Sequence, residues 1–281
     1  MKISIIIAVY KNYNALRLIF DALRQQTYKN FEVVVAEDDQ NETIKKVIEQ
    51  YKHILEIKHI SHPDDGLQKN IIQNKAIAAA SGEYLIFIDG DCIPYSNFVE
   101  NNMLLAQNKT VLTGRRVNLP KSYSEKLINN QLSSLELEKY YLYYGIKNLI
   151  WEKNVKFEQG IVTKPNSFLY NTFIKNRKRN IEILGCNFSC FKKDMLAING
   201  FDESYGYAIL GDDTDLTWRF QAAGCQLISS KNICNVFHLY HPPRSSSAVH
   251  DISYLIERFE YRKANALYIV EDSYGISKYV N

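Results

Sequence analysis

The chain has 281 residues, of which 46% are hydrophobic and 23% are charged, and its formal net charge at pH 7 is +3. This composition is that of a globular protein with enough apolar material for a core, and so small a charge gives no support for nucleic-acid binding. The five cysteines lack CxxC spacing, which indicates reduced thiols. Apolar runs are too short for a signal peptide or a membrane span, so we expect a cytoplasmic protein.

The first hundred residues alternate between strand and helix patterns. Residues 3–9 are apolar on both faces, as in a buried parallel strand, and an amphipathic helix is predicted at 15–25. Later elements are predicted as a strand at 31–36, a helix at 43–51, a strand at 56–61, a helix at 69–80 and a strand at 83–89. This alternation predicts right-handed βαβ units and a doubly wound, mostly parallel sheet flanked by helices.

Acidic residues follow two of these strands. Glu37 and Asp38 come after the second strand, and Asp89-Gly90-Asp91 ends the strand at 83–89. Paired carboxylates beside an apolar core are costly unless a partner compensates their charge. Carboxylates two residues apart suit a hard divalent cation, which in turn attracts a diphosphate. Because ligands bind beyond the carboxyl ends of such strands, the pattern favours a metal-assisted site; a plain Asp-Gly turn is the structural alternative.

Residues 115–183 interrupt the alternation. Residues 124–151 have the pattern of a long, aromatic-rich helix. Its leucine and tyrosine stripe fits packing on the sheet, which we favour, and also contact with a membrane or a lipid-linked acceptor. The basic cluster at 174–180 fits an anionic phospholipid or acceptor and a solvated loop equally well.

The alternation resumes near residue 184. The predicted elements are a strand at 184–191 that feeds a helix, an acid-led helix at 211–224, a short strand or loop with two histidines at 235–244, and a helical tail at 251–281. Gly206 and Gly211 have the spacing of a P-loop, but Asp212 and Asp213 follow where lysine and serine are needed. The chain also lacks GxGxxG and GxSxG motifs, which argues against a dinucleotide enzyme and a serine hydrolase.

Four stretches, taken in order, resemble motifs of the family-2 inverting glycosyltransferases with the GT-A fold. They are ISIIIAVYKN, LRQQTYKNFEVVVAEDDQNET, NKAIAAASGEYLIFIDGDC and GFDESYGYAILGDDTDLTWRF. Residues 184–242 also resemble the C-terminal motif region of galactosyl- and N-acetylgalactosaminyltransferases, including bacterial chondroitin-type polymerases. Residues 115–183 lie outside the resemblance.

The resemblance implies a GT-A domain over residues 1–245 and a C-terminal helical extension over 246–281. Within the domain, 1–114 would be the nucleotide-binding half, 115–183 a helical acceptor-side insertion, and 184–245 the half that holds the acceptor and the base.

The resemblance also implies a donor site. The residues assigned to the nucleotide and donor sugar are Ala8, Val9, Tyr10, Glu37, Asp38, Lys75, Asp89 and Gly90. Glu37 and Asp38 would contact uracil and ribose, and Lys75 would lie near the nucleotide. Asp39 stands where glycine is usual in the family.

A metal site and a base follow from the same resemblance. Asp91 would bind the metal directly, His238 would complete the metal shell, and His241 is the fallback ligand. A mixed shell of oxygen and imidazole favours Mn²⁺ over Mg²⁺. Asp213 matches the general base and Asp212 the residue that holds the donor sugar or the acceptor. Asp215 would supply charge at a helix N-terminus or serve as an alternative base.

The expected reaction moves galactose, N-acetylgalactosamine, N-acetylglucosamine or glucose from a UDP-sugar to a saccharide or lipid-linked saccharide. Bacterial surface polysaccharide synthesis is the expected setting, with peripheral contact at the inner membrane as an open option. Two alternatives remain. A non-catalytic sugar-binding protein would have lost metal or base acids, yet Asp89, Asp91 and Asp213 are present. A nucleotidyltransferase would usually carry a glycine-rich basic loop after the first strand, which AVYKNYNA lacks.

Overall fold

A computed structural model of the chain describes residues 1–147, 157–165, 167, 168, 170, 172, 181–206, 212–242 and 253–280. The strands of these residues form a large sheet, with the order β3-β2-β1-β4-β8-β6-β9, and a small sheet, with the order β5-β10-β7. The large sheet contains β1 (Ile3–Val9), β2 (Phe31–Glu37), β3 (Ile57–Ser61), β4 (Tyr84–Asp89), β6 (Thr110–Thr113), β8 (Asn187–Phe191) and β9 (Gln226–Ser229). The small sheet contains β5 (Cys92–Pro94), β7 (Arg116–Asn118) and β10 (Val236–His238).

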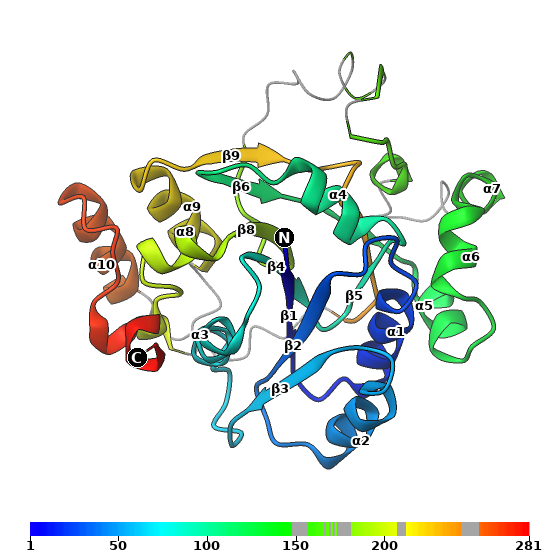
Figure 1. Ribbon diagram of the computed structural model, residues 1–281, viewed down its shortest axis with the longest axis horizontal. Helices are drawn as coiled ribbons and strands as arrows, with labels where there is room; N and C mark the ends of the chain where they lie inside the picture. The colour runs from blue at the N-terminus through cyan, green and yellow to red at the C-terminus, as the bar shows by residue number, and fades with distance from the viewer. Residues whose placement is uncertain are drawn as a thin grey trace.

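Helices cover both faces of the large sheet (Figure 1). On one side lie α1 (Tyr13–Leu23), α2 (Glu42–Tyr51), α4 (Phe98–Leu105) and α5 (Lys121–Ile128), and on the other α3 (Lys69–Ala79), α8 (Lys192–Ala197) and α9 (Asp212–Ala222). The remaining helices are α6 (Ser134–Lys139), α7 (Tyr141–Lys147) and α10 (Ser253–Ala264), with 3₁₀ turns η2 (Phe157–Gly160), η4 (Glu203–Tyr205), η5 (Asp272–Tyr274) and η6 (Ile276–Tyr279). In the described part of the chain, none of the helices is long and apolar enough to cross a bilayer.

The central strands are buried on both faces. In β1, Ile5 and Ile7 pack toward α1, whereas Ile6 packs toward α3. In β4, Ile86 and Phe87 divide in the same way. Because neighbouring side chains point to opposite faces of a strand, a continuous apolar run is what two helical layers require. The layers explain why these strands have no polar face.

The predicted doubly wound, mostly parallel sheet is confirmed. Strands β3, β2, β1 and β4 pair in parallel, and β6 pairs in parallel with β9. Strand β8 is the exception, since it runs antiparallel to both β4 and β6. Apolar strand patterns carry no information about direction, so the sequence did not predict this reversal.

The strand register brings the acids to one edge. Val9 pairs with Glu37, and Ala8 pairs with Asp89, so β1, β2 and β4 end level with one another. Just beyond β4, the Gly90 N–H donates to the Ala8 carbonyl at 2.7 Å. A Cβ at residue 90 would lie 2.7 Å from the Ala8 oxygen, which is too close for a side chain. Glycine is therefore needed between the two aspartates.

The prediction of one long helix over residues 124–151 is wrong for the part of it that the structure describes. Three short helices, α5, α6 and α7, replace it. The Arg17 side chain donates to the Ile128 carbonyl and to Asn130 Oδ1, which ends α5, and Asn130 has a positive φ of 57°. Ser133 then caps α6 by accepting from the Glu136 N–H. The basic cluster at 174–180 lies outside the described residues.

The leucine and tyrosine stripe divides between core and surface. Leu127, Leu137 and Tyr141 are buried in the core on the α1 side of the sheet, as the packing interpretation predicts. Leu142 and Tyr143, in contrast, point outward and are more than half exposed. The stripe is therefore mainly a packing surface whose outer residues face solvent.

The C-terminal segment packs against the rest of the molecule. Val270 and Ile276 are buried, and η6 lies against α3. The buried Arg262 donates to Asp202 Oδ2 at 2.5 Å. Asn199 fixes the following turn by donating to the Val270 carbonyl. Residues 253–280 thus complete the core on the α3 side of the sheet.

A fully buried acid lies at the start of β2, at the sheet edge opposite Asp89. Glu32 accepts hydrogen bonds from the Ser4 hydroxyl, from the Ser81 N–H and hydroxyl, and from Lys58. Burial by itself would raise the pKa of Glu32, but these partners lower it to about 2. The ionised carboxylate therefore stabilises the fold.

This contribution should disappear in acid. A group whose pKa falls from 4.5 in the unfolded chain to about 2 in the folded one stabilises the protein above the higher value. That stabilisation, at most about 3 kcal/mol, is lost as the pH drops through the folded pKa. Glu32→Gln removes the titrating group, so its free energy of unfolding in urea should vary less between about pH 5 and pH 2 than that of the wild type. The exposed Glu56→Gln is the control, and equal slopes for Glu32→Gln and wild type would contradict the assignment.

Candidate active site

The small sheet positions the candidate metal ligands. Strand β10 pairs antiparallel with β5, so His238 lies opposite Cys92, the residue after Asp91. Beyond this pair, the Leu239 N–H donates to the Asp91 carbonyl at 3.0 Å. On its other side, β10 pairs in parallel with β7. Two segments that are about 150 residues apart in the sequence are thereby fixed beside each other.

Asp91, His238 and His241 form a cluster of potential ligands. One ligand atom from each lies within 4.8 Å of the others. Nε2 of His238 lies 3.4 Å from Asp91 Oδ2, and Nε2 of His241 lies 3.5 Å from the same oxygen. Burial by itself would raise the pKa of Asp91, but the hydrogen bond with His238 and the charges of both histidines bring it below its usual range. His241, predicted only as the fallback, stands beside His238 rather than in place of it.

Asp89, the other acid of the pair, has a separate partner. Lys69 Nζ, at the start of α3, lies 2.7 Å from Asp89 Oδ1. Both side chains are partly exposed. The two aspartates around Gly90 therefore face different neighbours, Asp89 toward α3 and Asp91 toward β10.

Asp213 lies at the start of α9 on the same side of the molecule. Its Oδ1 accepts a hydrogen bond from the Gly185 N–H at 2.9 Å. Burial raises the pKa of Asp213 above its usual value, although the Gly185 N–H and the positive charge of Lys69 oppose the rise. A carboxylate with a raised pKa is better suited to accept a proton near neutral pH. The side chain of Asp212 lies outside the described residues.

Glu37 and Asp38 are each held by a histidine. Glu37 is fully buried, and Oε2 lies 2.5 Å from His59 while Oε1 accepts from the Asn41 N–H. Asp38 is also buried; its Oδ1 lies 2.7 Å from His62 Nε2, and its Oδ2 accepts from the Gln68 N–H. Their predicted contacts with uracil and ribose stay predictions.

Lys75 joins this network from α3. Its Nζ lies 3.4 Å from His62 Nδ1, on the opposite side of the ring from Asp38. A lysine can only donate, so the His62 nitrogen that faces it accepts and the other nitrogen donates to Asp38. In this structure the His62 ring therefore connects Lys75 to Asp38.

The residues that end β1 form an exposed rim. Ala8 and Val9 are mostly buried within the strand, and Tyr10 beyond them is 47% exposed. Lys11 has a positive φ of 54° and forms an ion pair with Asp64 at 2.5 Å, which joins the loop after β1 to the loop before α3. Tyr10 is thus presented outward beside the acids.

Two buried thiols and an arginine lie close to the cluster of Asp91, His238 and His241. Cys92 is fully buried, and its Sγ lies 3.6 Å from Asp91 Oδ1. Contact with the thiol of Cys186 and burial raise the pKa of Cys92 well above its usual value, so it stays a neutral thiol. Arg116 on β7 contributes positive charge near Cys186, Asp91 and Asp213. All five cysteines are unpaired, as predicted.

Asp215 is a structural residue rather than an alternative base. It is 1% exposed and accepts from Arg219 Nε at 2.5 Å and from the Tyr205 hydroxyl at 3.0 Å. A carboxylate fully engaged in a buried ion pair is not available to remove a proton from a substrate. The sequence-based expectation considered only the charge of Asp215 near the helix N-terminus. Its partner Arg219 lies one turn further along α9, at the i, i+4 spacing of a helical ion pair.

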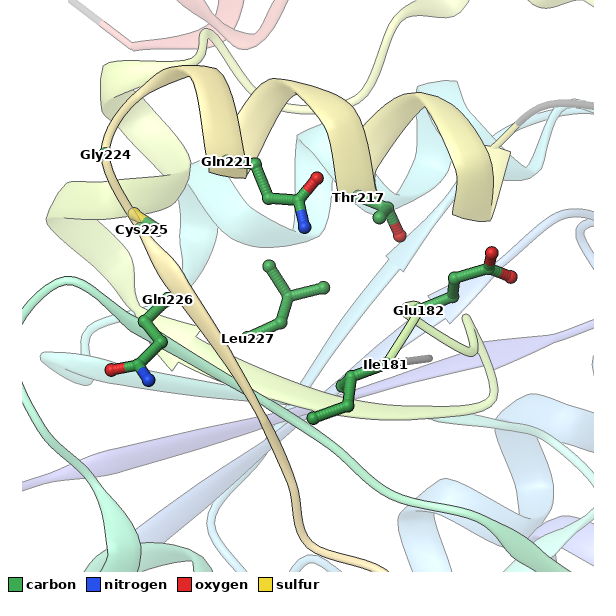
Figure 2. Close-up of a pocket in the computed structure, with 8 residues that line it drawn as sticks. All are labelled: Ile181, Glu182, Thr217, Gln221, Gly224, Cys225, Gln226 and Leu227. Carbon is green, nitrogen blue, oxygen red and sulfur yellow. The ribbon is translucent and has the colours of Figure 1, made fainter. Parts of the chain in front are cut away.

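A groove of about 740 Å³ runs beside α9 (Figure 2). Its lining is formed by Ile181, Glu182, Thr217, Gln221, Gly224, Cys225, Gln226 and Leu227. Figure 2 shows Thr217 and Gln221 on the part of α9 that borders the groove. They follow Asp213 at intervals of four residues, so the groove opens on the helical face that begins with Asp213. The metal-ligand cluster is not part of this groove.

Several residues of the edge were missed by the sequence reasoning. They are His59, His62, Lys69, Arg116 and Gly185. For the histidines the signal is present in the sequence, because His59 lies on β3 and β3 neighbours the acid-ended β2. Lys69 and Gly185 have no such signal, since their partners come from distant parts of the chain.

The fold is that of the GT-A glycosyltransferases, and comparison with known proteins gives the family. Residues 4–183 match Glycosyl transferase family 2, and residues 168–242 match the N-terminal domain of galactosyltransferase. The chain belongs to Glycosyl transferase family 2. The second match covers the region that resembles galactosyl- and N-acetylgalactosaminyltransferases in sequence.

Similar proteins support the same class. Chondroitin synthase of Pasteurella multocida is 27% identical over 236 residues, which are 79% of this chain, and the chain spans 23% of that protein's length. Residues 1–349 of S. aureus TarS, solved with UDP-GlcNAc, superimpose with a TM-score of 0.60 at 14% identity, covering 96% of this chain and 68% of that one. GalNAc-T7, solved with UDP, GalNAc and Mn²⁺, gives a TM-score of 0.60 at 13% identity, covering 92% and 48%. These structural likenesses show a shared fold.

The contact between Gly185 and Asp213 predicts a separation of activity from stability. A methyl group on Gly185 would lie 2.6 Å from Asp213 Oδ1, and a flexible side chain can rotate away from it. Gly185→Ala should therefore lower turnover of a nucleotide-sugar donor by about ten- to a hundredfold and change the melting temperature little.

Gly82→Ala is the matched contrast, because its methyl group would lie 2.6 Å from the backbone nitrogen of Ser4 at the far edge of the sheet. This variant should lower the melting temperature and leave the turnover of the folded protein intact. Turnover of Gly185→Ala at the wild-type level would show that Asp213 does not need its observed position.

Proposed function

We propose that the chain is a metal-dependent, inverting hexosyltransferase that moves a sugar from a UDP-sugar to a saccharide or lipid-linked saccharide acceptor. The observation that carries the proposal is the cluster of Asp91, His238 and His241 at the same sheet edge as Asp213. The cluster would bind a metal ion, which would in turn bind the diphosphate of the nucleotide sugar. Asp213 would accept the proton that the acceptor hydroxyl loses.

The ligand chemistry of the cluster fits a divalent metal. One carboxylate oxygen and two imidazole nitrogens form a mixed set that suits Mn²⁺ better than Mg²⁺. Bound there, the metal would supply charge stabilisation to the departing nucleoside diphosphate. The solved Mn²⁺ complexes of GalNAc-T7 and of the Pyrobaculum calidifontis mannosyltransferase PcManGT support this cofactor.

The donor would lie across the ends of β1, β2 and β4. Tyr10 and the backbone of Ala8 and Val9 would border the nucleoside, near Glu37 and Asp38. Asp38 and its partner His62 form a rigid hydrogen-bonding unit beside this position. Asp89, next to Gly90, would face the ribose and the donor sugar. The TarS complexes with UDP and UDP-GlcNAc support a uridine donor.

The acceptor would approach from the side of α9. Inversion requires a base opposite the leaving group that removes the hydroxyl proton as the new bond forms. Asp213 is assigned this role, because its Oδ1 is anchored by the Gly185 N–H and burial favours proton acceptance. The groove beside Thr217 and Gln221 begins one turn beyond this carboxylate and would hold the rest of a saccharide. The chondroitin synthase relatives support a polysaccharide product of the bacterial cell surface.

The proposal is tested by separating the base from the metal ligands. Wild-type protein with Mn²⁺ is screened for UDP release from UDP-galactose, UDP-N-acetylgalactosamine, UDP-glucose and UDP-N-acetylglucosamine. Asp213→Asn keeps the size of the side chain but cannot accept the proton, so turnover should fall by at least about a hundredfold. Its Mn²⁺-dependent UDP binding, measured by calorimetry, should stay near that of the wild type.

His238→Ala should show the reverse pattern, with weaker binding of Mn²⁺ and UDP together. The control is His53→Ala, at an exposed histidine beyond α2. If Asp213→Asn abolishes UDP binding while turnover survives at high Mn²⁺, Asp213 belongs to the metal shell. Absence of UDP release from all four donors, together with UDP binding that needs no metal, would contradict the proposed function.

A further inference from the structure

Lys69 lies between the two carboxylates that the proposed reaction assigns to donor and acceptor. It is the first residue of α3, and its Nζ lies 2.7 Å from Asp89 Oδ1. A Cβ placed on Gly185 would lie 3.8 Å from Lys69 Nζ and 2.6 Å from Asp213 Oδ1. Lys69 Nζ and Asp213 Oδ1 therefore lie no farther apart than the sum of these two distances. The same ammonium group thus contacts Asp89 directly and places positive charge close to Asp213.

The charges around Asp213 make this lysine important. The charged groups that act most strongly on Asp213 are Lys69 from α3, Asp89 from the end of β4 and Arg116 from β7. Asp89 disfavours the ionised form of Asp213, and the two cations favour it. Of these cations, Lys69 has the larger effect and also contacts Asp89 directly. Without Lys69, two like charges would remain next to each other in a partly buried site.

The position of Lys69 at the start of α3 adds to the positive charge near these acids. The first turn of α3 has no acidic residue, and its N-cap, Gln68, forms no side-chain capping bond. The positive end of the helix dipole therefore lies at the residue whose ammonium group contacts Asp89. The Gln68 N–H is directed to Asp38, so the start of α3 serves more than one acid of the sheet edge.

We propose that Lys69 is a positioning residue of the transfer reaction, which holds Asp89 toward the donor and keeps Asp213 ionised until the acceptor proton arrives. The inference rests on the proposed function, because it assumes that Asp213 is the base. Lys69 itself transfers no proton and forms no covalent bond. It acts through the two carboxylates, so its loss should alter how the reaction depends on pH.

The test compares Lys69→Met, Lys69→Gln and Lys69→Arg by the pH dependence of kcat/KM for UDP release from the donor that the wild type hydrolyses fastest. Removing the cation destabilises the ionised form of Asp213, so the acid limb should move to higher pH by about one unit in the Met and Gln variants. Lys69→Arg should restore the wild-type limb. Lys2→Met is the matched control, because Lys2 forms an ion pair of the same 2.7 Å length, with Glu56, at the opposite edge of the sheet.

An acid limb that stays at the wild-type pH in Lys69→Met and Lys69→Gln would overturn the inference. An equal loss at every pH that Lys69→Arg does not repair would also overturn it, because it would indicate a merely structural lysine.

A second measurement separates this inference from the proposed function. The Asp213 carboxyl carbon is followed by NMR in protein labelled with ¹³C-aspartate, with Asp213→Asn providing the assignment. The titration midpoint should rise in Lys69→Met and Lys69→Gln relative to wild type and Lys2→Met. If the wild type hydrolyses no donor, the proposed function fails, and an unchanged midpoint would still overturn the role of Lys69.

Discussion

The backbone pairing between β5 and β10 is the constraint on which the site depends. Antiparallel pairing of Cys92 with His238, followed by the hydrogen bond from the Leu239 N–H to the Asp91 carbonyl, fixes where the second aspartate meets the histidines. The side chains alone would not hold this arrangement, because flexible groups lose entropy when they are ordered. Here the sheet has already fixed the backbone. The small sheet thus links the segment that follows β4 to the segment that carries His238 and His241.

Charge compensation organises the rest of this edge. Each acid there has its own partner from a neighbouring element: Glu37 has His59, Asp38 has His62, Asp89 has Lys69, Asp91 has His238 and His241, and Asp213 has the Gly185 N–H. The partners explain how several carboxylates gather beside an apolar core in one fold. Asp215 and Glu32, whose partners enclose them completely, serve stability instead. A partly exposed pair such as Lys69 with Asp89 leaves room for a substrate.

The sequence predicts the parts of this account that depend on local patterns. Strands buried on both faces give unbroken apolar runs, so β1, β2 and β4 and the acids that follow them are readily identified. Features that depend on which segments become neighbours are harder to predict. The reversal of β8 is one example, and the end of α5, fixed by Arg17 from a distant helix, is another. Lys69 could not be paired with Asp89 from spacing, and the choice between His238 and His241 was unnecessary because β10 brings both to Asp91.

The central claim is that this edge of the sheet holds a divalent metal through Asp91 and the histidines. Diffraction data collected at the manganese absorption edge, from crystals grown with Mn²⁺ and UDP, test it most directly. The account predicts one anomalous peak per chain, in contact with an Asp91 oxygen and the Nε2 atoms of His238 and His241, with the UDP diphosphate completing the shell. A peak bound instead by Glu37, Asp38 or Asp213, or ordered UDP with no peak beside it, would contradict the account.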